Sequence, residues 1–279
     1  MLKFFLLGIY GRVVSYLPSW FISLLCSLGE KVFLLTSMKS RVQRGMKQFP
    51  LPKGCDIENL TRKHLRFLLF LFHQFLRLRY HRHFRHRLGD VVRRQGEEFL
   101  KEALKAGRGV ILVSLHLGNF IWSISYLASV YPVNLVARAQ SNPRWEAYVE
   151  QMRKALKIKT IYREGAAWKV KDGLRKGEVV VFFIDQYVLP FFYGPDSRRR
   201  EIVPRLARSS GAPVIPFYTL EGEDGLIILR FLPPLEGVSS SKLEEIVING
   251  IREDPHLWFW WRRLGKANIE YKRLECRGY

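Results

Sequence analysis

The stretch "VILVSLHLGNFIW", residues 110–122, decides the fold class of this chain. Its first six residues are apolar with one exception, which is typical of a strand buried on both faces of a sheet. The apolar run then meets His116 and Asn119 before it resumes. Because Asn caps helix starts well, the stretch predicts a strand over 110–115 followed by a helix over 119–130.

The same alternation continues along the chain. Further strands are predicted over 133–138, 158–162 and 179–185, with helices over 143–156 and 166–177 between them. Strands and helices that alternate at this spacing favour an α/β fold, in which a mainly parallel sheet is covered by helices.

The first 35 residues are unusually apolar. Residues 4–29 contain one charge, Arg12, and a membrane-spanning helix needs about 20 mostly apolar residues. Since Arg12 and Pro18 interrupt the run, we expect residues 1–35 to form a membrane-anchoring helix, either a tilted span or a hairpin lying in the interface. The alternative is an apolar helix that docks on the core of the domain.

The charge is strongly positive, with 46 Lys and Arg against 25 Asp and Glu and a net charge of +21. This balance implies an anionic partner, which is a nucleic acid, an acidic membrane or an acidic protein. A helix predicted over 57–94 changes from apolar to basic, and such a helix is typical of a membrane surface, although a solvated charged face is the alternative. Its basic residues are Arg77, Arg79, Arg82, Arg85 and Arg87.

The sequence lacks the motifs of several classes of enzyme and binding protein. The sequence has no nucleophile elbow, no P-loop and no dinucleotide fingerprint. Its three cysteines are scattered, and the histidines at 81, 83 and 86 lack metal-ligand spacing, so we expect no metal and no cofactor. A nucleic-acid-binding protein would not need the apolar N-terminus.

Polar side chains follow three of the predicted strands. His116, Arg138 and Asp185 each stand where an apolar strand ends, and ligands of open α/β sheets bind beyond these ends. Histidine suits a general base. Gly118 permits a close approach of backbone or substrate, and the helix that begins at Asn119 would direct free N–H groups at a developing oxyanion.

Five motifs then resemble the lipid A biosynthesis acyltransferase family, which is related to the glycerolipid and phosphatidylinositol mannoside acyltransferases. They are "HLGNF" (116–120), "VVFFIDQ" (180–186), "FFYG" (191–194), "RLARSSGAPVIPFY" (205–218) and "DPHLWFWWRR" (254–263). The resemblance implies a glycerolipid acyltransferase-like fold and an acyltransferase domain over residues 36–279. It also implies transfer of a fatty acyl group from an acyl carrier protein or coenzyme A thioester to a hydroxyl of an anionic glycolipid, at the cytoplasmic face of the inner membrane.

The sequence departs from the family at one position. The family pattern places an acid five residues after the histidine, where this chain has Ile121. An isoleucine cannot orient or charge-stabilise an imidazole. Either the protein is an inactive, membrane-attached basic relative, or another carboxylate serves. Asp185 is the first candidate, since it ends at the same sheet edge as His116, and Glu164 is the second.

The resemblance also suggests residues that touch substrate. Arg138 matches a family arginine, whose expected role is to hold the donor or a phosphate or to stabilise the oxyanion. Gly118, Asn119, Arg163, Glu164 and Arg205 are expected to line the substrate site. The aromatic stretch 257–263 is either core or a wall for the acyl chain.

Overall fold

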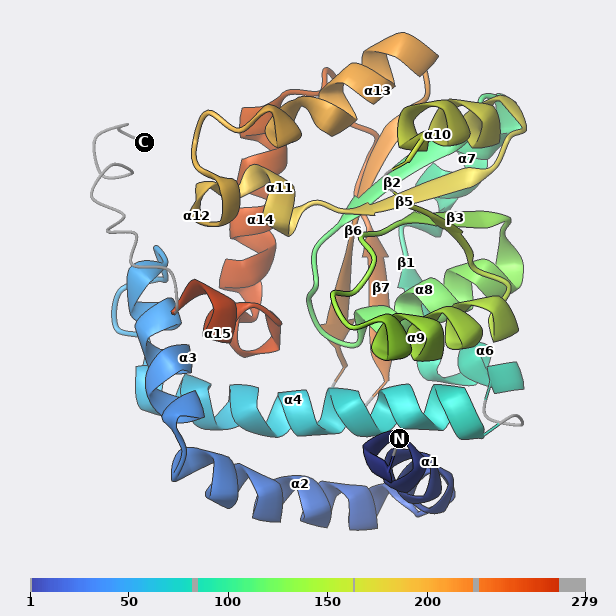
Figure 1. Cartoon of the computed structure of the whole chain (residues 1–279). Coiled ribbons are helices and arrows are strands. Elements are labelled where there is room, and N and C mark those ends of the chain that lie inside the picture. Colours follow the sequence, from blue (N-terminus) through green and yellow to red (C-terminus); the bar gives the residue numbers. More distant parts are fainter. Residues whose placement is uncertain (1, 82–84, 163, 223–225, 266–279) are drawn as a thin grey trace.

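The computed structural model describes residues 2–81, 85–162, 164–222 and 226–265 (Figure 1). The α-helices are α1 (Leu2–Ser15), α2 (Ser19–Leu34), α3 (Ser37–Gln48), α4 (Ile57–Tyr80), α6 (Leu88–Val91), α7 (Glu97–Lys105), α8 (Phe120–Val130), α9 (Pro143–Ala155), α10 (Ala166–Arg175), α11 (Asp185–Val188), α12 (Pro190–Tyr193), α13 (Ile202–Ser210), α14 (Ser240–Glu253) and α15 (Trp261–Leu264). The 3-10 helices are η1 (Arg198–Glu201) and η2 (Pro255–Leu257). The strands are β1 (Val92–Gln95), β2 (Val110–Ser114), β3 (Val133–Val136), β4 (Lys159–Ile161), β5 (Val179–Phe183), β6 (Val214–Glu221) and β7 (Ile227–Phe231).

The sheet has seven strands in the order β1-β7-β6-β2-β5-β3-β4. All neighbouring pairs are parallel except β6 and β7. The predicted α/β fold with a mainly parallel sheet is therefore confirmed, and β2 and β5 lie side by side in its middle. The register pairs Ser114 with Phe183, which brings the ends of these two strands to the same level.

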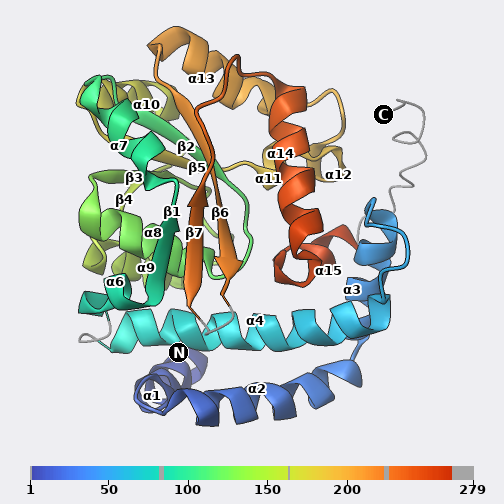
Figure 2. The same ribbon diagram turned by 180° about the vertical axis from the view of Figure 1, so that it is seen from behind.

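Helices cover both faces of the sheet (Figures 1 and 2). Alternate residues of β2 and β5 enter two separate hydrophobic cores, with Ile111 and Phe182 in one and Leu112 and Val181 in the other. All five residues of β2 are buried. This explains why the strand reads as a continuous apolar run rather than an alternating one.

Helix α4 runs along one end of the sheet and carries α1 and α2 on its other side (Figures 1 and 2). The side chain of Asp56 caps its start by accepting a hydrogen bond from the Asn59 amide at 3.0 Å. The helix predicted over 57–94 was too long, because α4 ends at Tyr80 and the chain forms β1 at 92–95. Strand β1 is short and mostly polar, so its sequence lacks the apolar pattern of a strand. Its conformation is set by pairing with β7.

The apolar N-terminus forms two helices rather than one anchoring helix. They are separated near Pro18 and both pack against α4. Arg77 of α4 donates a hydrogen bond to the Leu17 carbonyl at 2.5 Å, and Arg66 donates one to Ser23 at 2.8 Å. One face of this segment is therefore docked on the rest of the protein, which is the alternative given above.

Within the described residues, no single helix has the length and hydropathy to cross a bilayer. The bent pair α2 and α3 passes the same test when the two helices are taken together, at an angle of 85°.

Candidate active site

His116 lies on a short loop that follows β2 at the carboxyl edge of the sheet. A segment near the C-terminus fixes the loop by pairing with it. The Phe259 amide donates to the His116 carbonyl at 2.9 Å, and the Gly118 amide donates to the Leu257 carbonyl at 3.1 Å. The backbone of His116 is therefore held from both sides, by the end of β2 and by the segment 257–259.

Asp185 begins α11 directly after β5 and lies against His116. The His116 Nδ1 atom is 2.9 Å from the Asp185 Oδ1 atom and 3.2 Å from Oδ2. The contact predicted from the sequence is therefore confirmed as geometry. Glu164, the second candidate, is exposed in the turn before α10, and the hydrogen bonds of the described residues do not join it to His116.

The Asp185 carboxylate is completely buried. Besides the imidazole, it accepts hydrogen bonds from the backbone amides of His116 and Gln186, both at 3.1 Å, and from the Trp258 indole at 3.0 Å. Burial would raise the pKa of Asp185. The charge of His116 and the hydrogen bonds from His116 and Trp258 outweigh burial and hold the pKa below its ordinary value of 3.8. The carboxylate is thus ionised at neutral pH.

The orientation of the imidazole follows from this contact. An ionised carboxylate only accepts hydrogen bonds, so Nδ1 carries a proton, and in the neutral imidazole Nε2 carries the lone pair. The His116 side chain is 20% exposed, so a substrate can reach it. Four aromatic rings surround it at 4.6–6.5 Å between centroids, and they belong to Phe120, Phe183, Phe259 and Trp260.

The residues that follow His116 have structural reasons to be where they are. Gly118 has φ = +54°, and a Cβ atom there would stand 2.5 Å from the Thr219 carbonyl oxygen, so glycine is required. Asn119 caps α8 as predicted, with Oδ1 accepting from the Trp122 amide at 3.4 Å. Ile121, in the position of the family acid, is half-buried and packs against both hydrophobic cores.

The aromatic C-terminal segment contributes two side chains to the core and two to the surroundings of His116. Trp258 and Trp261 are fully buried. Phe259 and Trp260, which lie between them in the chain, are half-buried and face His116. Within the described residues, the buried indole nitrogen of Trp260 has no hydrogen-bond partner.

The predicted arginines do not all gather at this site. Arg138 is exposed just after β3 and interacts with Tyr193 and Tyr187, near α11. Arg205 is exposed on α13, and no hydrogen bond or ion pair of the described chain links it to His116. Arg163 lies outside the described residues. Trp258 and Gln186 also bond to Asp185, and Arg263 bonds to Gln186. All three lie in the motifs quoted above, but the sequence indicated no role for them because only the fold brings them to Asp185.

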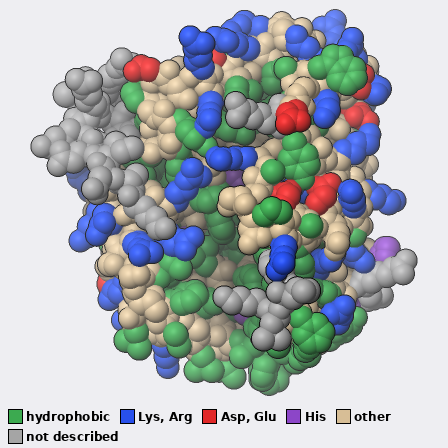
Figure 3. Space-filling view, viewed as in Figure 1, with side chains coloured by type: hydrophobic (Ala, Val, Ile, Leu, Met, Phe, Trp, Pro, Cys, Tyr) green, Lys and Arg blue, Asp and Glu red, His purple; other side chains and the backbone are tan. Residues whose placement is uncertain are grey.

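The face that contains the site is hollowed at its centre, between α15 and α9 (Figure 3). Hydrophobic side chains line the hollow, and Lys and Arg side chains gather beside it over α11, α12 and α15. Among the described residues, no group of three or more His, Cys, Asp or Glu is placed to hold a metal ion.

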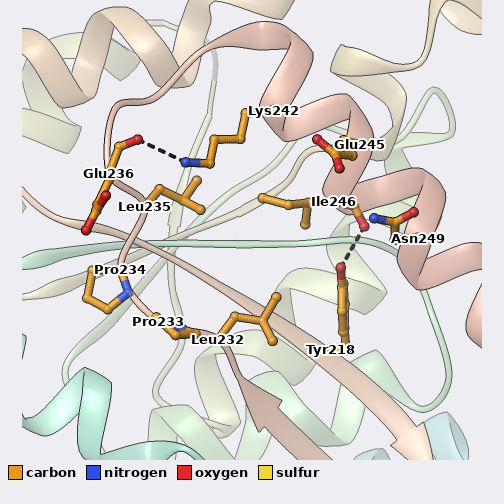
Figure 4. A pocket seen from close by; sticks show the side chains of 10 residues that line it. All are labelled: Tyr218, Leu232, Pro233, Pro234, Leu235, Glu236, Lys242, Glu245, Ile246 and Asn249. Carbon is orange, nitrogen blue, oxygen red and sulfur yellow. Dashed lines mark hydrogen bonds between the residues drawn. The ribbon is translucent and has the colours of Figure 1, made fainter. Parts of the chain in front are cut away.

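A separate pocket lies between α14 and the segment that follows β7 (Figure 4). Leu232 and Leu235 in its wall bond to the carbonyls of Pro216 and Val214, near the start of β6. The pocket therefore lies toward the edge of the sheet opposite to His116. Its polar side chains are tied locally, with Tyr218 donating to the Ile246 carbonyl at 2.7 Å and Lys242 to the Glu236 carbonyl at 2.9 Å. We assign it no catalytic role.

The indole hydrogen bond to Asp185 yields a prediction about pH. An ionised Asp185 stabilises the fold fully above its unfolded-state pKa, and this stabilisation is lost as the pH falls through the lower folded-state pKa. Trp258→Phe removes one donor and raises the folded-state pKa. The pH-dependent part of the stability should therefore be smaller and should be lost at a higher pH, as measured by urea unfolding between pH 2.5 and 7.

Trp261→Phe is the matched control. Trp261 is equally buried, but its indole donates to the Pro255 carbonyl at 2.6 Å. Both variants should lose stability, by about 1–3 kcal/mol, because each loses a buried hydrogen bond and some packing. Identical pH dependence in the two variants would contradict the assigned environment of Asp185.

Comparison with known proteins completes the description of the site. A comparison with curated proteins gives no match. The crystal structure of the 1-acyl-sn-glycerophosphate (LPA) acyltransferase from Thermotoga maritima is similar over 83% of this chain and 96% of that chain, with 15% identity and a TM-score of 0.39. The family model of the bacterial lipid A biosynthesis acyltransferases matches residues 1–266. Because the match spans nearly the whole sequence, the chain belongs to this family, and the class of activity supported by this membership is acyl transfer.

Proposed function

We propose that this protein transfers a fatty acyl group from an acyl carrier protein or coenzyme A thioester to a hydroxyl of a glycolipid such as a lipid A precursor, with His116 as general base. The observation that carries the proposal is the His116–Asp185 contact at 2.9 Å on a reachable histidine. A buried ionised carboxylate that fixes one imidazole nitrogen leaves the other nitrogen free to accept a proton, as in hydrolase triads.

The reaction needs two proton movements. Nε2 of His116 takes the hydroxyl proton of the acceptor while the acceptor oxygen attacks the thioester carbonyl carbon. The resulting tetrahedral intermediate collapses, the carbon–sulfur bond breaks, and the imidazolium returns the proton to the leaving thiolate. The products are an ester and a free thiol. Asp185 stays ionised throughout and stabilises the imidazolium.

The oxyanion of the intermediate requires hydrogen-bond donors. The first backbone amides of an α-helix have no hydrogen-bond acceptor within the helix. Helix α8 begins four residues after His116, so its first amides lie near the site. These amides are our candidates for the oxyanion hole. The aromatic rings around His116 are suited to exclude water and to contact the first methylenes of the acyl chain.

Attachment to the cytoplasmic face of the inner membrane is part of the proposal. Helices α1 and α2 leave a large apolar face uncovered, which follows the lower edge of the molecule in Figure 3. Its exposed residues are Phe5, Leu6, Ile9, Tyr10, Val13, Tyr16, Trp20, Leu24, Leu28, Val32 and Leu35. An apolar face of this extent is typical of a membrane contact, and two helices that lie in the interface need not span the bilayer.

The basic segment 77–87, which begins in α4, has a smaller share in this attachment than the sequence suggested. Arg77 bonds to the Leu17 carbonyl, and Arg79 donates to Gln151 at 2.6 Å and stacks on Tyr148. Arg87 pairs with Asp90, and Arg82 lies outside the described residues. We therefore propose that the apolar face of α1 and α2 is the main contact, aided by the overall positive charge.

One observation favours a second function. Ile121 stands where the family has an acid, and this suits an inactive relative that binds a membrane without catalysis. Asp185 weakens this alternative, because it supplies a carboxylate to His116 from the start of α11. Turnover of an acyl thioester by the wild-type protein separates the two functions.

The catalytic proposal predicts the effects of two substitutions. His116→Ala should lower turnover by roughly 100-fold or more, since no base remains to take the hydroxyl proton. Asp185→Asn should lose most of the activity but remain folded, because the tautomer and the imidazolium lose their support. The measurement is the release of free thiol from an acyl thioester.

His86→Ala and Asp172→Asn are the controls for these substitutions. His86 is exposed, and Asp172 pairs with Lys176 on the surface of α10. Both variants should keep wild-type activity. Near-normal turnover in His116→Ala would remove the histidine from the mechanism, and no thioester turnover by the wild type would favour the inactive relative.

The membrane proposal predicts that charge on the apolar face of α2 prevents binding. Leu24→Glu combined with Leu28→Glu should lower vesicle binding at least tenfold, since each leucine side chain that the lipid buries contributes about 2 kcal/mol to binding. Co-sedimentation with vesicles of a neutral and an anionic lipid measures this. Trp168→Glu on α10 is the control, because Trp168 is also exposed but lies away from α1 and α2. Equal loss in both variants would contradict the assigned face.

A further inference from the structure

The indole nitrogen of Trp260 is buried and, within the described part of the chain, bonds to no acceptor. The ring of Trp260 lies beside that of His116, with 5.2 Å between the centroids and 75° between the planes. An indole N–H can only donate a hydrogen bond, and proteins keep few buried donors without an acceptor, because such a donor gives up its hydration for nothing. The N–H of Trp260 is therefore available to an acceptor from a ligand.

The two neighbouring tryptophans of the same segment have bonded indoles. Trp258 donates to the Asp185 carboxylate at 3.0 Å, and Trp261 donates to the Pro255 carbonyl at 2.6 Å. Trp260 lies between them in the chain. Because the fold satisfies the indole on each side, the unsatisfied N–H of Trp260 is not a general property of this segment. It is specific to the one tryptophan of the three whose ring faces His116.

The position of Trp260 is fixed through its backbone and through Phe259. The Trp260 carbonyl accepts hydrogen bonds from the amides of Arg263 at 2.8 Å and Leu264 at 3.0 Å, in the first turn of α15. The Phe259 ring packs edge-on against the indole at 4.8 Å between centroids. The Phe259 amide donates to the His116 carbonyl. The segment that carries the indole is thus tied to the loop that carries His116.

The proposed reaction brings two oxygens to this point, the acceptor hydroxyl and the thioester carbonyl. The hydroxyl gives its proton to Nε2 of His116. The carbonyl oxygen only accepts hydrogen bonds and becomes negatively charged in the tetrahedral intermediate, so it needs hydrogen-bond donors. Aromatic rings surround the indole, and an acyl chain matches such a surface better than the hydroxyl groups of a sugar do. The carbonyl oxygen is therefore the acceptor that fits Trp260.

We propose that Trp260 is a catalytic residue that donates its indole hydrogen bond to the carbonyl oxygen of the acyl thioester. This inference rests on the proposed function, in which the thioester reacts at His116. It adds a side-chain hydrogen-bond donor to the first amides of α8. The indole nitrogen is covered while the side chain as a whole is half-buried, so the ring turns about its side-chain bonds to reach the carbonyl oxygen. The hydrogen bond strengthens when that oxygen becomes an oxyanion.

NMR of the full-length protein in detergent, labelled with nitrogen-15 in its tryptophans, tests this contact without turnover. The probes are two unreactive analogues of the acyl thioester. The ketone analogue has a methylene in place of the sulfur and keeps the carbonyl, whereas the thioether analogue keeps the sulfur and lacks the carbonyl oxygen. Each analogue is prepared on coenzyme A and on acyl carrier protein, so both carriers are covered.

The indole proton of Trp260 should move downfield when the ketone analogue binds and should move less with the thioether analogue. Single Trp→Phe substitutions assign its signal among the seven tryptophans. The wild type should bind the ketone analogue about five- to tenfold more tightly than the thioether analogue, as expected for one neutral hydrogen bond. Trp260→Phe keeps an aromatic ring but lacks the N–H, so it should bind both analogues about equally.

Trp261→Phe is the matched control, because its indole bonds to the Pro255 carbonyl within the chain. It should keep the preference for the ketone analogue. Thermal unfolding identifies a misfolded variant. The comparison of the two analogues on the wild type then still decides, since they differ at the carbonyl and sulfur alone. In an active protein, Trp260→Phe should lower turnover roughly 10- to 100-fold and should change donor affinity less, because the oxyanion needs the hydrogen bond more than the carbonyl does.

The inference about Trp260 and the proposed function can fail separately. Equal binding of the two analogues by the wild type, a Trp260 signal that is the same in both complexes, or no binding of either analogue on either carrier overturns the role of Trp260. Thioester turnover accompanied by one of these results leaves the proposed function standing. A shift of the Trp260 signal that is specific to the ketone, in a protein without turnover, would refute only the proposed catalysis.

Discussion

The buried carboxylate of Asp185 is the constraint on which the rest of the site depends. An ionised carboxylate without water is costly unless hydrogen bonds satisfy its oxygens. Four donors do so, and they come from the loop after β2, the start of α11 and the aromatic C-terminal segment. Each donor reaches the carboxylate only if particular elements of the fold are neighbours. The imidazole and amide of His116 require β2 and β5 to be neighbours in register, and the indole of Trp258 requires the C-terminal segment to return to the carboxyl edge of the sheet.

The N-terminal helices hold that C-terminal segment in place. On α4, the buried His64 bonds through Nδ1 to the His256 carbonyl at 2.8 Å, and burial lowers the pKa of His64 to about 4, so the imidazole is neutral and donates. Helix α3 approaches α15 so closely that a Cβ atom on Gly45 would stand 2.2 Å from the Trp261 carbonyl oxygen. Helices α1 and α2, which pack on α4, carry the apolar face on their outer side. The proposed membrane contact and the buried Asp185 carboxylate are therefore joined through one continuous packing of α2, α3, α4 and α15.

Local patterns predicted the strands β2, β3, β4 and β5, and the apolar runs of β2 and β5 also predicted the His116–Asp185 contact. Parallel strands bring their carboxyl ends to one edge, so the polar residue at each end can be placed without a structure. Other features have no local signal. Strand β1 exists only because β7 offers it a partner, and Trp258 reaches Asp185 only through the pairing of 257–259 with the His116 loop.

The central claim is that Asp185 fixes the His116 proton on Nδ1 and leaves Nε2 as the base. Nitrogen-15 NMR of histidine-labelled protein at neutral pH measures this directly, with His116→Gln used to assign its signal among the seven histidines. The account predicts that His116 is the Nδ1–H tautomer, that its Nδ1 proton is shifted strongly downfield by the carboxylate, and that Asp185→Asn abolishes this shift. A His116 protonated on Nε2, or a His116 signal unchanged in Asp185→Asn, would contradict the account.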